Sequence, residues 1–199
     1  ASMRRTLLNR GARIGLAEAL SMGDGPTTMR LLKDGRRSLP RVVPNGGSLL
    51  MFARTAKAID RLLELGVSLS LEDRWGATPM EAFSRLGPKG KPLLEHLATH
   101  GVVVDSPALA RINDRRRLAA AVAEDPAIAR QPAVLHAAVD FSRPALVEWL
   151  FLRGADPNVR DAGEAKRPPL DSAAWHGDLR LVKRPVVPGA ERRHRDRQY

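Results

Sequence analysis

Short apolar stretches that end in glycine recur along the chain at nearly constant intervals. They end at Gly35, Gly66, Gly101, Gly154 and Gly189. The intervals 35–66, 66–101 and 154–189 span 31, 35 and 35 residues, and the longer interval 101–154 divides if "RRRLAAAVAEDP" is another helix. Since periods of about 20–50 residues are typical of stacked repeats, the chain is expected to form a repeat protein.

Composition agrees with such a core. The 199 residues would hold five to six repeats, and 43% of them are hydrophobic but only 4% aromatic, so leucine, alanine, valine and isoleucine must fill the interior. There is no cysteine, which excludes disulfides and thiolate metal sites. No apolar run reaches the roughly 18 residues of a membrane span, and Arg10, Arg13 and Glu18 interrupt any signal-peptide core. We expect a soluble, cytoplasmic monomer.

Residues 66–101 show the content of one unit. After Gly66 comes an extended stretch, then Asp73 and Gly76, which suit a tight turn. Thr78 and Pro79 are a typical N-cap and first helical residue for "PMEAFSRL". A second helix, "KPLLEHLATH", ends at Gly101. Helices this short are unstable alone, so neighbouring units must stack.

These units resemble the ankyrin repeat, with its T-P-L-H-x-A pattern. The matching stretches are "GATPMEAF" (76–83), "AVLHAAV" (133–139), "RPPLDSAAWHG" (167–177) and the junction "GADPN" (154–158). Glu81 and Asp171 stand where the family has histidine, and Pro168 replaces threonine. Only His136 keeps the histidine, whose ring the resemblance implies bonds to backbone at the turn. The chain is similar to a divergent, bacterial-type member of the family.

The resemblance implies an all-α, ankyrin-like solenoid of about five helix-turn-helix repeats with short extended turns. We assign 1–13 to a cloning scar and partial N-terminal cap, 14–190 to the solenoid, and 191–199 to a basic tail. Repeats are expected at about 14–47, 48–76, 77–106, 107–132 and 133–190. Pro185 and Pro188 predict a short or broken last helix, because proline disrupts helix interiors. Both ends stop mid-unit, which is consistent with a piece of a longer protein or with divergent caps.

The sequence contains no catalytic constellation, and we expect no enzyme activity, cofactor or metal. His96 and His100 share a helix face, but Leu97 follows the first histidine where the zinc-metalloprotease pattern has glutamate. Partly exposed polar groups before a helix end are the favoured interpretation. "GPKGKP" (87–92) lacks the spacing of a phosphate loop and is expected to be a lengthened loop between helices. "DPNVRDAG" (156–163) lacks the glycine position of a calcium loop.

The net charge of +11 leaves three interpretations open. Basic runs can bind nucleic acid or an acidic protein, or can simply be a solvated surface. The arginines are scattered, and only eight aromatic residues could stack on bases. A solvated surface is therefore favoured, followed by an acidic protein partner and then by nucleic acid.

The three tryptophans differ in their expected roles. Trp149, within "LVEWLF", is expected to pack in the core, whereas the family layout puts Trp75 at a turn tip and Trp175 at the exposed end of a first helix. Such positions line the concave face through which ankyrin proteins bind partners. The predicted contacts are Arg74, Trp75, Arg85, Asp140, Phe141, Trp175 and His176. The predicted function is a non-catalytic scaffold or adaptor; the alternatives are a basic nucleic-acid-binding module and a regulatory fragment of a larger effector or enzyme.

Overall fold

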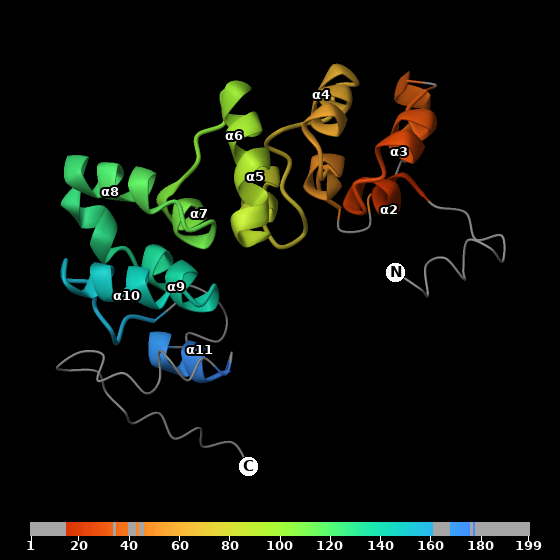
Figure 1. Ribbon diagram of the computed structural model, residues 1–199. Helices are drawn as coiled ribbons and strands as arrows, with labels where there is room; N and C mark the ends of the chain where they lie inside the picture. The colour runs from red at the N-terminus through yellow and green to blue at the C-terminus, as the bar shows by residue number, and fades with distance from the viewer. Residues whose placement is uncertain are drawn as a thin grey trace, which may run out of the picture. The chain divides into compact units, whose positions relative to one another are not determined.

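The computed structural model describes residues 15–33, 35–39, 43, 46–160, 168–175 and 177. Throughout these ranges the regular elements are helices, without a strand, as the sequence predicts (Figure 1). The chain forms two compact units, one of Ala1–Phe83 with Pro92–Val102 and one of Ser84–Lys91 with Val103–Tyr199. The predictions for residues 1–13, for His176 and for the helix and tail beyond 177 lie outside the described residues.

In the first unit, short helices pack in pairs. The elements are α2 (Leu16–Ser21), α3 (Gly25–Leu31), η1 (Gly35–Ser38), η2 (Leu49–Phe52) and α4 (Ala56–Glu64), with most of α5 (Pro79–Ser84) and α6 (Lys91–Thr99). Within the pairs, α2 packs on α3 and η2 on α4; between the pairs, α2 contacts η2 and α3 contacts α4. First helices thus stack on first helices, and second helices on second helices, as in a solenoid.

The second unit repeats this arrangement. It contains η3 (Gly87–Gly90), α7 (Ser106–Arg111), α8 (Arg115–Glu124), η4 (Pro126–Arg130), α9 (Pro132–Asp140), α10 (Pro144–Phe151) and α11 (Pro169–Trp175). The first helices α7, α9 and α11 stack in order, while α8 and α10 pack on α7 and α9 (Figure 1). All residues from Val134 to Val139 on the central helix α9 are buried. Residues 87–90, predicted to be a loop, instead form a 3-10 turn, for which Pro88 is a suitable first-turn residue.

Local sequence explains why the helices begin where they do. Four aspartates cap helix starts by accepting a backbone N–H: Asp24, Asp105, Asp114 and Asp125. At α5, Thr78 Oγ1 accepts from the Glu81 amide at 3.3 Å and Pro79 is the first helical residue, as expected. Each cap satisfies a donor that the helix leaves unpaired.

Gly154 ends α10 in the left-handed conformation, with φ of +86°, as the repeat alignment predicts. The Ala155 amide donates to Leu150 O at 3.2 Å and the Gly154 amide to Phe151 O at 2.9 Å. This pair of bonds is the Schellman motif, which requires a positive φ at its closing residue. The same two bonds follow Gly66 and Gly101.

Two further Schellman motifs close first helices without glycine. Asn113, after α7, has φ of +59°, and Ser142, after α9, has φ of +51°. Behind them, the Asp114 amide donates to Leu109 O and the Arg143 amide to Ala138 O, both at 2.9 Å. In the repeat formed by α9 and α10, the Schellman motif therefore ends both helices, at Ser142 and at Gly154.

Candidate functional site

The turn at 73–76 presents Trp75 to solvent. Asp73 Oδ1 accepts from the amides of Trp75 and Ala77, both at 2.9 Å, and the Gly76 amide donates to Asp73 O at 2.9 Å. The predicted tight turn is therefore present and well bonded. The Trp75 side chain is 71% exposed, and the Arg74 guanidinium lies 4.5 Å from the centre of its ring. This cation–π contact orients the indole without burying it.

The loop that carries this turn is docked on residues 47 and 48 of the same unit. Ser48 Oγ donates to Ser68 O at 2.7 Å. A Cβ on Gly47 would lie only 3.0 Å from the Asp73 Cα and 2.8 Å from its Cβ. Because only a residue without a side chain fits there, Gly47 allows the backbone of the turn to approach closely.

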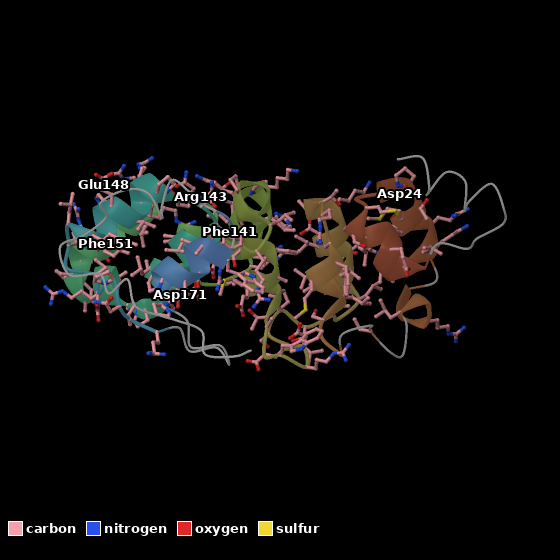
Figure 2. All side chains as sticks on the ribbon, turned by 90° about the horizontal axis from the view of Figure 1, so that it is seen from below. Asp24, Phe141, Arg143, Glu148, Phe151 and Asp171 are labelled. Atoms are coloured by element: carbon pink, nitrogen blue, oxygen red, sulfur yellow. The ribbon has the colours of Figure 1, made fainter. Side chains whose placement is uncertain are left out.

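Like Trp75, Arg74 belongs to the first unit. The remaining predicted contacts that the structure describes lie in the second unit. Arg85 and Asp140 are exposed, and Trp175, the last residue of α11, is 73% exposed. Phe141 is half-buried, because its ring packs 3.6 Å from the position a Cβ on Gly87 would take. The Phe141 ring therefore packs against Gly87 and is still partly accessible to solvent. Figure 2 labels Phe141 beside Arg143, just beyond the end of α9.

Arginines at equivalent places in successive repeats link the helix ends of this unit, and sequence reasoning missed them. Arg111 Nη1 donates to Ser84 Oγ at 3.1 Å, and Arg143 Nη2 donates to Arg111 O at 3.4 Å. Lys91 Nζ lies 3.0 Å from Asp114 Oδ2. Burial raises the pKa of Asp114, but Lys91 and the Arg117 amide lower that pKa more, so it stays below the ordinary value. Within the second unit, these bonds connect Ser84 and Lys91 to α7 and to the start of α8, and α7 to the residues that follow α9.

Trp149 packs in the core, as predicted. Its side chain is only 8% exposed. The Arg153 guanidinium lies 3.9 Å from its ring centre and that of Arg115, on α8, lies 5.9 Å away. Arg153 Nη1 also donates to Trp149 O at 3.2 Å. Two cations thus cover the indole from solvent.

His96 and His100 converge on a residue that the sequence analysis did not include. Asp60 Oδ1, on α4, lies 2.6 Å from His96 Nε2 and 3.1 Å from His100 Nε2. The hydrogen bond from His96 is the largest cause that holds the pKa of Asp60 below its ordinary value. Asp60 lies 36 residues before His96 and 40 residues before His100, so no local sequence pattern predicts the contact. It could have been suggested only by the equivalent places of these residues on, or just after, the second helices of adjacent repeats.

Comparisons with known proteins identify the repeat. A sequence model described as "Ankyrin repeats (many copies)" matches residues 135–184. The chain contains ankyrin repeats. The sequence matches no curated protein.

Two solved structures share the ankyrin fold of this chain. One is a chain from the structure described as the predatory endopeptidase Bd0816 from Bdellovibrio bacteriovorus in complex with the immunity protein Bd3460. Its TM-score is 0.55 and its identity 20%, and the similarity covers 86% of this chain and 96% of that one. The other is the human ASB11 ankyrin repeat domain, with a TM-score of 0.50 and 19% identity, covering 86% and 81% of the two chains. At such low identity these similarities concern the fold.

His136 occupies the histidine position of the ankyrin pattern and makes the bond that the resemblance implies. It is buried, and its Nε2 lies 3.3 Å from Val159 O, at the turn before the next repeat. Because a carbonyl only accepts, Nε2 carries the proton. Nδ1 is buried, with no hydrogen-bond partner among the described residues. The histidine therefore has a structural role between repeats.

Ankyrin repeats generally mediate protein–protein interaction. None of the helices that the structure describes is long and apolar enough to cross a bilayer.

Proposed function

We propose that this ankyrin protein is a non-catalytic scaffold or adaptor that binds a protein partner through its turn tips and the ends of its first helices. The observation that carries the proposal is the exposed Trp75, held over a bonded turn by Arg74. Large aromatic side chains are the commonest anchors of protein interfaces. A pre-ordered turn reduces the entropy lost when such an anchor is buried.

Trp175 supports the proposal from the second unit. It is as exposed as Trp75 and ends a first helix, the position through which ankyrin proteins contact partners. Arg85 and Asp140 are exposed polar groups suited to the rim of an interface, and Phe141 adds a partly accessible ring. His176 follows Trp175 directly and is kept in the proposed set.

An acidic protein is the partner that the charge favours. The net charge is +11, and the consecutive arginines Arg115, Arg116 and Arg117 at the start of α8 are all exposed. Electrostatic complementarity would raise the association rate and select against basic partners. The structurally similar chain from a complex with an immunity protein is consistent with a protein ligand. We take the protein to be a cytoplasmic monomer.

The test is a comparative affinity capture from the source cell. Wild type, Trp75→Ala and Trp175→Ala are used as baits, with Leu152→Ala as the control. Leu152 is 81% exposed, follows the second helix α10 and is not one of the proposed contacts. A true partner is retained by wild type and the control and depleted by the tryptophan variants. Equal capture by all four baits would contradict the proposal.

Nucleic acid binding is the second candidate, which the net charge favours. A salt titration of the purified complex separates the two. A nucleic-acid ligand gives a log–log slope of about −0.7 to −0.9 per neutralised phosphate and little dependence on Trp175. A protein ligand anchored by tryptophan shows a shallower slope and loses about 2 kcal/mol or more of binding free energy in Trp175→Ala.

A further inference from the structure

A cluster of two histidines and one aspartate joins α4 to α6 within the first unit. His96 lies on α6 and His100 one turn later, just after the helix ends, so their rings share one face. Their ring centres are 5.1 Å apart, at an interplanar angle of 76°. One ligand atom from each of the three residues lies within 4.8 Å of the others.

Both imidazoles direct Nε2 at the same carboxylate oxygen. The Nε2–Oδ1 distances are 2.6 Å from His96 and 3.1 Å from His100. Neutral imidazoles in this arrangement donate two hydrogen bonds to an ionised Asp60. In the other neutral tautomer each imidazole carries its proton on Nδ1, and both Nε2 atoms then present a lone pair, so that two nitrogens and one carboxylate oxygen converge.

This donor set suits zinc. Zinc binds imidazole nitrogen and carboxylate oxygen at about 2.0–2.2 Å, so tetrahedral ligand atoms are about 3.3 Å apart. His100 Nε2 is already close to that separation from Asp60 Oδ1, and His96 Nε2 needs to withdraw by less than about 1 Å.

The surroundings permit an ion to enter. All three side chains are partly exposed, between 24% and 45%, which leaves room for water as a fourth ligand. By helical register the cation nearest to Asp60 is Lys57, one turn earlier on α4, and its side chain is exposed. Arg61, the next residue, is paired with Glu64 at 2.8 Å. The site therefore combines access from solvent with an ionised carboxylate.

We propose that Asp60, His96 and His100 bind one zinc ion, which clamps α4 to α6 and so fastens two successive repeats. This site is separate from the turn-tip residues assigned to partner binding. The ion would replace two hydrogen bonds with three coordinate bonds between the same helices, and would stabilise the folded unit by mass action.

Zinc affinity is measured on the full chain by competition with a chromophoric chelator, after the metal has been stripped. Wild type should bind one ion at this site, and His100→Gln and Asp60→Asn should each weaken that binding by about tenfold or more. Glu64→Gln, on the same helix as Asp60, and His194→Gln, outside the described residues, are the matched controls and should bind as wild type does. Circular dichroism verifies that every variant is folded.

Two further readouts distinguish coordination from adventitious binding. Cobalt added to wild type should give the visible absorption of a tetrahedral site, absent from His100→Gln. Zinc should raise the melting temperature of wild type but not of His100→Gln. Zinc affinity that is unchanged in both His100→Gln and Asp60→Asn would overturn the proposal, as would failure of wild type to bind zinc.

Discussion

Replacement of Trp149 by alanine should strongly destabilise the second unit. A tryptophan buries about 150–250 Å², and this one is only 8% exposed. At about 25 cal/mol per Å² the burial is worth about 4–6 kcal/mol. Alanine retains a small part of it, and incomplete collapse of the cavity adds a cost, so we expect a loss of about 3–5 kcal/mol. Loss of the ring beneath Arg153 contributes about 0.5–1 kcal/mol of this.

Urea unfolding followed by far-ultraviolet circular dichroism measures the effect. Trp175→Ala is the matched control: the same change at a side chain 73% exposed should alter the unfolding free energy by less than about 0.5 kcal/mol. Arg153→Ala, alone and with Trp149→Ala, completes a double-mutant cycle for the cation–π contact. A Trp149→Ala midpoint equal to that of wild type, or an equal loss in Trp175→Ala, would refute the assigned packing.

Three further outcomes follow from the structure. Gly154→Val should cost about 1–2 kcal/mol in urea unfolding, because its φ of +86° brings Cβ close to the following carbonyl; an unchanged midpoint would contradict this. Asp114→Asn keeps a capping oxygen but loses the charge facing Lys91. Since the pKa of Asp114 is lowered in the folded state, its stabilisation should be present above the ordinary value of 3.8 and vanish as pH falls through the lowered one, so acid unfolding curves of variant and wild type should converge at low pH. Gly47→Ala should displace Asp73 and the turn after it, cost about 1–3 kcal/mol, and change the fluorescence of the exposed tryptophan there; an identical spectrum and stability would count against the close approach.

The sequence was sufficient for features that depend on neighbours in the chain. The glycine spacing predicts the repeat, and the cap residues Thr78 and Pro79 predict where α5 begins. The apolar pattern around Trp149 predicts its burial. These succeed because capping, helix periodicity and the positive φ of Gly154 are set within a few residues.

Glycine is not the only residue that ends these helices. Asn113 and Ser142 adopt the same left-handed conformation at the ends of first helices, so a pattern built on glycine alone omits these two helix ends. Asparagine tolerates this conformation through its short polar side chain, but serine gives little local signal for it. The surrounding repeat imposes it at Ser142.

Contacts between repeats were decided by the tertiary structure alone. The sequence places His96 and His100 on one face, but it does not bring Asp60 to them. It does not seat the Phe141 ring against Gly87, nor join Arg111 to Ser84. Each of these contacts depends on how far one repeat is shifted and rotated relative to the next. That geometry results from the combined packing of alanine and leucine across the stacked helices, and no single stretch of sequence specifies it.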